Sequence, residues 1–121
     1  MAKNDYDTVL YKLLIYLYAC MKREIIFDET VFDQTIRTCA GNEQYFNEIL
    51  SMAQDEGLIR DVTIVRAWGT DILIASPLED MKITSAGIHY LKENSQMKKV
   101  GTMLLESVDI FSSLIKVLGL M

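Results

Sequence analysis

The feature that most constrains this 121-residue chain is a short region of strand-like sequence enclosed by helical sequence on both sides. β-Branched residues are dense in Val62–Trp68 and Ile72–Ala75, and Gly69-Thr70-Asp71 between them is typical of a tight turn. Gly57-Leu58-Ile59 precedes the region, and Ile83–Leu91 follows it as the expected start of another helix. We therefore predict a two-stranded ribbon packed against helices.

Length and composition indicate a single small domain. Half of the residues are apolar, which is enough for one core without disulfides or metal. Cys20 and Cys39 show no CxxC spacing, so we expect free thiols in a reduced, cytoplasmic protein. The apolar runs are shorter than the roughly 18 residues that a membrane helix needs, and we expect no membrane contact.

The sequence before the ribbon has the period of helices. Apolar residues recur at three- and four-residue steps from Tyr6 to about Arg23, which predicts a first helix with one apolar stripe, capped by Asp5 or Asp7.

Asp28 is placed to cap a second helix over about Glu29–Cys39. Ala40-Gly41-Asn42 then forms a turn before a third helix over about Glu43–Glu56, and Gly57 ends that helix. Two amphipathic helices joined by a short Gly-containing turn are typical of a helix-turn-helix.

Two more helices are expected after the ribbon. Thr84 is placed to cap the first, and the helical Gly87 indicates close approach of another backbone. The second is predicted as one long helix from Gln96 to Leu118. We therefore divide the chain into a domain at residues 1–95 and a C-terminal helix at 96–121.

The apolar stripe of the last helix has two interpretations. It includes Leu104, Phe111 and Leu118, spaced seven apart, together with Leu114. The helix could pack on its own domain, or it could pair with a second copy through these four residues and form a homodimer.

The order of elements resembles the winged-helix superfamily, so the expected fold class is mainly α (α+β): a winged helix-turn-helix with a two-stranded wing and an extra long C-terminal helix. Four motifs add detail to this resemblance: Tyr45-Phe46-x-x-Ile49-Leu50, Glu56-Gly57-Leu58-Ile59, Ile83-Thr84-x-x-Gly87-x-x-Tyr90-Leu91 and Lys92-Glu93-Asn94-Ser95-x-Met97-Lys98-Lys99. Through these motifs the chain resembles, more specifically, the YjcQ family, over about Asp5–Val100. The resemblance implies a small cytoplasmic protein of Gram-positive bacteria or their phages and prophages, and it provides no catalytic residues to carry over to this chain.

The fold favours a DNA-binding protein similar to a transcriptional regulator. The third helix would turn Gln44, Asn47 and Ser51 outward, and these residue types can read base edges of double-stranded DNA. On the wing, Arg60, Arg66 and Lys82 could contact phosphates.

The charge distribution favours a different function. Met1–Gly57 contains five basic and ten acidic residues, and Glu43–Glu56 contains four acids with no Lys or Arg. Such a helix repels the DNA backbone. The alternative is a winged-helix protein-interaction module without DNA affinity, whose partner is a basic protein.

An enzyme is the third class. Nucleophilic or acid–base catalysis needs a base beside its nucleophile. His89 is the only histidine, and the two cysteines are isolated in sequence. We therefore expect no catalytic residues, no metal site and no cofactor.

Overall fold

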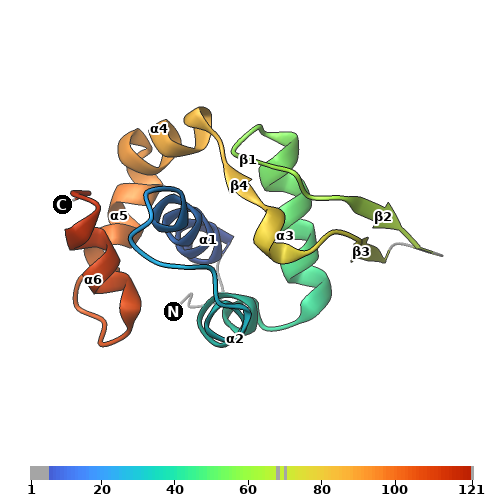
Figure 1. Ribbon diagram of the computed structural model, residues 1–121, viewed down its shortest axis with the longest axis horizontal. Coiled ribbons are helices and arrows are strands. Elements are labelled where there is room, and N and C mark those ends of the chain that lie inside the picture. The colour runs from blue at the N-terminus through green and yellow to red at the C-terminus, as the bar shows by residue number, and fades with distance from the viewer. Residues whose placement is uncertain (1–5, 68, 70, 121) are drawn as a thin grey trace.

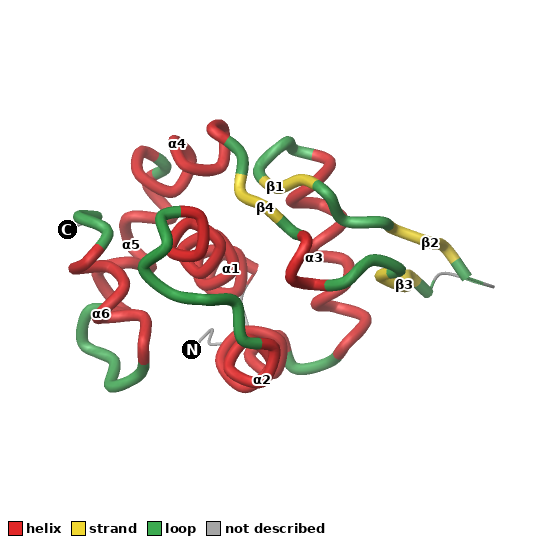
Figure 2. The backbone as a smooth tube through the Cα atoms, in the orientation of Figure 1, coloured by secondary structure: helices red, strands yellow, loops and turns green. Residues whose placement is uncertain are grey.

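The computed structural model describes residues 6–67, 69 and 71–120, in which helices surround one central helix and a ribbon projects at one end (Figure 1). The elements in chain order are α1 (Tyr6–Met21), α2 (Glu29–Phe32), η1 (Asp33–Arg37), η2 (Thr38–Ala40), α3 (Glu43–Asp55), β1 (Ile59–Arg60), β2 (Ile64–Arg66), β3 (Ile72–Ile74), η3 (Leu78–Asp80), β4 (Lys82–Ile83), α4 (Ser85–Glu93), α5 (Ser95–Leu104) and α6 (Ile110–Val117). The predicted mainly α, winged-helix class is confirmed (Figure 2). The candidate cap Asp5, the strand end Trp68 and the turn residue Thr70 lie outside the described residues.

The central helix α1 is enclosed on almost every side. It contacts α3, α4, α5, α6 and β4, and all of its residues from Thr8 to Ala19 except Lys12 are buried. The predicted single stripe is therefore too narrow: Tyr11 and Tyr16 are each only 1% exposed. The sequence permits burial on several sides of α1 because Lys12 is the one charged residue of the helix after Asp7. The Lys12 ammonium lies over the ring of Phe111, 5.2 Å from its centroid.

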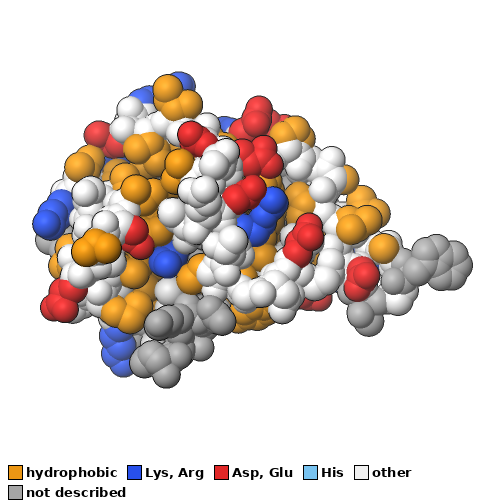
Figure 3. Space-filling view, turned by 90° about the horizontal axis from the view of Figure 1, so that it is seen from below, with side chains coloured by type: hydrophobic (Ala, Val, Ile, Leu, Met, Phe, Trp, Pro, Cys, Tyr) orange, Lys and Arg blue, Asp and Glu red, His pale blue; other side chains and the backbone are white. Residues whose placement is uncertain are grey.

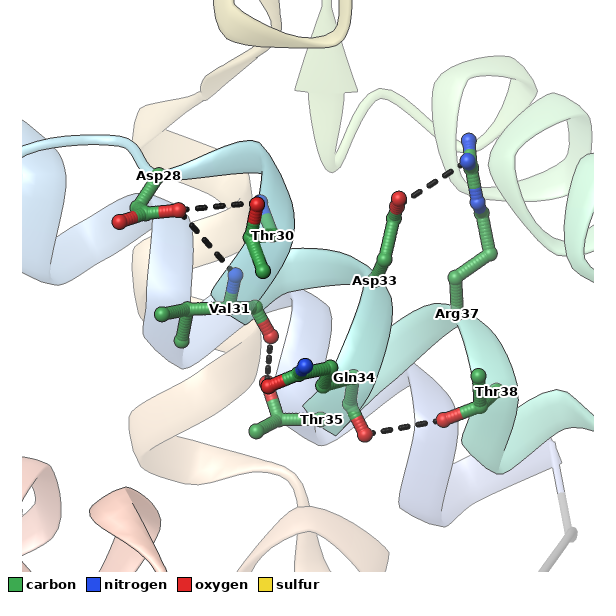
Figure 4. Close-up of polar contacts among 8 residues, drawn as sticks. All are labelled: Asp28, Thr30, Val31, Asp33, Gln34, Thr35, Arg37 and Thr38. Atoms are coloured by element: carbon green, nitrogen blue, oxygen red, sulfur yellow. Dashed lines mark hydrogen bonds and ion pairs between the residues drawn. The ribbon is translucent and has the colours of Figure 1, made fainter.

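The first helix of the helix-turn-helix changes width along its length. The Asp28 carboxylate caps it by accepting from the Val31 N–H (3.2 Å), as predicted. The helix then widens into the π-helical turn η1 and tightens into the 3₁₀ turn η2. The Thr35 and Thr38 hydroxyls each donate to the carbonyl four residues earlier, at 2.6 and 2.9 Å (Figure 4). These bonds compete with the backbone N–H groups and favour the wider turn.

Both ends of α3 are fixed by residues that the sequence identifies. The Asn42 side chain accepts from the Tyr45 N–H at 2.8 Å. At the other end Gly57 has a positive φ of 78°, and the Leu58 N–H donates to the Ala53 carbonyl at 2.9 Å. This is a Schellman motif, which Gly favours because it has no Cβ.

The ribbon is one hairpin with a break in the middle. β1 pairs with β4 and β2 pairs with β3, both antiparallel. From the Arg60–Lys82 pair to the Ile64–Ile74 pair, three residues (61–63) lie on the outgoing side and seven (75–81) on the return side. The 3₁₀ turn η3 takes up the excess. The two predicted strands are therefore confirmed, but β2 and β3 are shorter than the β-branched stretches from which they were predicted.

The base of the ribbon is packed directly against α4. The Thr84 hydroxyl caps α4 by accepting from the Gly87 N–H (2.9 Å), and it also donates to the Gly57 carbonyl. A Cβ on Gly87 would overlap the Leu58 carbonyl oxygen and lie 2.8 Å from the Ile83 side chain. The predicted cap and the predicted close approach are both confirmed.

The prediction of one helix from Gln96 to Leu118 is wrong. The chain turns between α5 and α6, where the Ser107 hydroxyl lies within hydrogen-bond distance of the Leu104 carbonyl (2.8 Å) and the Asp109 carboxylate (2.7 Å), two acceptors for its one O–H. Asp109 then accepts from the Phe111 N–H (3.1 Å) and caps α6. The reversal lets both helices pack against α1.

The apolar stripe of the C-terminal region belongs to the core of its own chain. Leu104, Phe111, Leu114 and Leu118, the residues proposed for dimerisation, are at most 6% exposed. The expectation that they present a surface to a second copy is therefore wrong, and the alternative, packing on the same domain, is what the structure shows.

Candidate interaction surface

The polar face of α3 is bonded to the ribbon. The Gln44 amide accepts from the Ile72 N–H (2.9 Å) and donates to the Ile72 carbonyl (3.2 Å). The Asn47 amide donates to the same carbonyl at 2.9 Å. Asn47 is only 4% exposed. Two of the three candidate base-reading residues therefore have their amides engaged by a backbone peptide of β3.

The same arrangement recurs at the other end of the helix. The Gln54 amide donates to the Val62 carbonyl (2.8 Å) and accepts from the Val62 N–H (2.9 Å). Ser51, the third candidate base reader, is 6% exposed. The prediction that Asn47 and Ser51 face outward is wrong, because the ribbon covers that face of α3.

The part of α3 that reaches solvent is acidic. Its exposed residues are Glu43, Met52 and Asp55, and Glu56 is exposed directly after the helix. Such a surface repels phosphates and attracts cationic groups.

The basic residues of the wing do not form one strip. Arg60 and Lys82 lie opposite each other at the base of the ribbon. Arg60 forms an ion pair with Asp61 at 2.8 Å. Arg66 is exposed nearer the ribbon tip. Lys98 and Lys99 do not extend this set, because they are on α5, at the opposite end of the molecule from β2 and β3 (Figure 1).

A groove of about 570 Å³ lies between the helix-turn-helix and the ribbon. We call it the wing groove and define it by its lining residues: Glu29, Arg37, Glu43, Asn47, Val65, Leu73, Ile74, Ala75, Ser76, Pro77, Leu78 and Glu79. In the view from below, acidic side chains lie beside hydrophobic ones and beside a patch of Lys or Arg on the half of the molecule toward the ribbon (Figure 3).

The wing groove has an acidic rim. Glu29, Glu43 and Glu79 line it and are exposed. Arg37 also lines it, but its guanidinium pairs with the Asp33 carboxylate at 3.1 Å (Figure 4). Because Asp33 offsets this positive charge, the groove favours cationic ligands.

The wing groove also has an apolar wall that sequence reasoning missed. Val65 and Leu73 are cross-strand partners, yet they are 43% and 50% exposed. Their neighbours Ile64 and Ile72 are also apolar, so both faces of the ribbon are apolar in sequence. A ribbon that packs on one side can cover only one of its faces. The apolar sequence of both faces could therefore have identified Val65 and Leu73 as an exposed apolar pair.

The described groups with shifted pKa values lie around α1 and away from the wing groove. Burial raises the pKa of the Tyr11 phenol to about 12 and that of the Cys20 thiol to about 11, although Lys82 partly opposes the shift at Cys20. Burial also raises the pKa of Tyr6 to about 12, with a smaller contribution from Glu56. Because burial disfavours the charged form, these shifts move the ionisation of the phenols and the thiol further above pH 7.

The comparison with protein families agrees with this architecture. The model of the YjcQ protein family matches residues 11–110, from α1 through the ribbon to the start of α6, and the chain belongs to this family. No curated protein and no solved structure match the chain. Within residues 6–67, 69 and 71–120, no helix has the length and apolar content required to span a bilayer.

Proposed function

We propose that this chain is a winged-helix protein-interaction module, acting in the cytoplasm and without catalysis, that does not read DNA through α3. The observation that carries the proposal is the bonding of Gln44, Asn47 and Gln54 to ribbon backbone groups. Freeing these amides for bases would leave the Ile72 and Val62 peptides without partners. An unpaired buried polar group costs about 1–3 kcal/mol, so base reading would have to offset that loss at each site.

The electrostatics support the same proposal. Non-specific DNA affinity comes mainly from Lys and Arg contacts to phosphates. The exposed residues of α3 include the acids Glu43 and Asp55, with no basic residue anywhere in that helix. A basic protein partner would meet complementary charge there.

The test has a nucleic-acid arm and a protein arm. A duplex of roughly 20 base pairs, about two helical turns, is titrated by fluorescence anisotropy at about 0.01 M ionic strength, where the Debye length is about 30 Å. The tagged chain is also used to capture partners from bacterial lysate. We expect no duplex binding and a captured protein whose retention falls as salt rises. Duplex binding with no captured protein would contradict the proposal.

DNA binding through the wing is the second candidate function, and would make the chain similar to a bacterial or phage transcriptional regulator. It is supported by the exposed positions of Arg60, Lys82 and Arg66 on the ribbon. If it holds, Arg60→Ala and Lys82→Ala together should reduce duplex affinity. The slope of log affinity against log salt concentration should also become shallower, by the amount expected for the loss of about two phosphate contacts. The same substitutions leave α3 unchanged, so they separate wing contacts from helix contacts.

A further inference from the structure

We propose that the wing groove binds an extended segment of a partner protein, in which Lys or Arg alternates with apolar residues, and that this segment pairs with the outer edge of β3. The inference rests on the proposed function, and it specifies the place and the chemistry of the partner.

The strand pairing fixes which backbone groups of β3 face the outer edge. The Ala75 N–H donates to the Thr63 carbonyl at 2.8 Å, so these two residues occupy a hydrogen-bonding position of the ladder, although the Thr63 N–H itself donates to the Ser76 hydroxyl at 2.9 Å. Hydrogen-bonded and non-hydrogen-bonded pairs alternate along antiparallel strands. Ile72 and Ile74 are therefore in non-bonded pairs, and their N–H and C=O groups point away from β2.

One of these two edge positions is occupied and the other is open. At Ile72 the Gln44 amide donates to the carbonyl and accepts from the N–H, as a neighbouring strand would. At Ile74, in the part of the chain that the structure describes, the N–H and C=O have no hydrogen-bond partner. Ile74 also lines the wing groove. A strand added in the groove would extend the bonding that Gln44 begins.

The side chains around this open edge select the composition of the added strand. Successive side chains of a strand point to opposite faces, so one set can contact the apolar wall while the other reaches the rim. The wall offers Leu73, half exposed, and Leu78. The rim offers the carboxylates of Glu43 and Glu79. Apolar residues alternating with Lys or Arg satisfy both, whereas the phosphates of a nucleic-acid strand would be repelled.

The probe for the test is a capped six-residue peptide that alternates valine and lysine. It is titrated into the full chain and followed by NMR, with amide hydrogen exchange measured free and bound. We expect saturable binding and slower exchange of the Ile74 amide. Two matched peptides serve as controls: one alternates valine and glutamate, and the other has three valines followed by three lysines. Both should bind more weakly.

Protein variants locate the site. Glu43→Gln combined with Glu79→Gln should weaken binding about five-fold, since each exposed ion pair contributes modestly. Glu93→Gln combined with Glu106→Gln removes the same charge from exposed positions outside the wing groove and should leave the affinity unchanged.

The outcomes separate this inference from the function on which it rests. Failure of the valine–lysine peptide to bind, unchanged Ile74 exchange, or equal weakening by the two variant pairs would overturn the groove assignment. If a partner captured by the wild-type chain is retained equally by the Glu43→Gln, Glu79→Gln variant, the groove assignment fails but the proposed function stands. Duplex binding with no captured partner would instead overturn the proposed function.

Discussion

The two halves of the ribbon are held to the molecule in different ways. The base, β1 and β4, is fixed by close packing, because Gly87 of α4 lies against the Leu58 carbonyl and leaves no room for a Cβ. The outer half, β2 and β3 with the residues 61–63 that lead into β2, is fixed by side-chain amides of α3 that bond to the backbone N–H and C=O groups of Val62 and Ile72.

This difference separates two roles within one hairpin. Close packing at the base tolerates no extra volume and sets the orientation of the ribbon relative to α4. Amide bonding in the outer half uses the polar face of α3 and leaves Val65 and Leu73 partly exposed. The base therefore serves the fold, while the outer half provides the candidate binding surface.

The largest expected effect is at the base. Gly87→Ala places a methyl group against the Leu58 carbonyl oxygen and should lower the free energy of unfolding by about 3 kcal/mol, the upper end for overpacking. Urea denaturation measures it. The control Ala86→Gly, at the preceding exposed position, should cost only about 1 kcal/mol. Similar losses for the two variants would mean that the base has room to adjust.

The second effect tests the amide bonding of the outer half. Gln54→Ala leaves both polar groups of the Val62 peptide without their partner and should cost about 2 kcal/mol. Hydrogen exchange at Val62 should accelerate. Asp55→Ala, at the adjacent exposed position, is the control and should change stability by about 0.5 kcal/mol or less. No acceleration at Val62 would show that Gln54 does not hold the ribbon.

A third and smaller effect concerns the cap that joins the base to α4. Thr84→Val removes the hydroxyl that accepts from the Gly87 N–H and donates to Gly57, and should cost about 1 kcal/mol. The exposed neighbour Ser85 gives the control Ser85→Ala, for which thermal unfolding should shift little. If both variants unfold at the wild-type temperature, the cap contributes nothing measurable.

The smallest effect on stability is expected at the exposed apolar pair. Leu73→Ser should change the free energy of unfolding by about 0.5 kcal/mol or less, because the side chain is half exposed. The same variant should weaken binding of the valine–lysine peptide, which NMR titration measures. Ile72→Ser, at a fully buried position of the same strand, should destabilise the protein far more. Unchanged peptide affinity in Leu73→Ser would remove the apolar wall from the site.

The sequence predicted those parts of the fold that depend on local chemistry. The caps at Asp28, Asn42 and Thr84 and the stop at Gly57 each act on backbone groups within a few residues. The break before α6 also had a local signal, Ser107-x-Asp109, but the continuous apolar stripe was a stronger indication of one helix.

The candidate site was harder to predict because its partners are distant and generic. Nothing in the residue type distinguishes a Gln that reads a base from one that bonds a backbone peptide 28 positions away, as Gln44 does. Likewise, the spacing of Leu104, Phe111 and Leu118 suits a helix pair in either one chain or two. Only the fold shows that the C-terminal chain reverses and buries this stripe against α1.

Hydrogen exchange at Ile72 and Ile74 tests most directly the claim that α3 uses its polar face to hold the ribbon. Both amides point to the outer edge of β3, but only Ile72 is bonded, by Gln44. We expect slow exchange at Ile72, fast exchange at Ile74, and loss of the difference in Gln44→Ala. Equally fast exchange at both positions in the wild-type chain would contradict it, and would leave the polar face of α3 available to bind DNA.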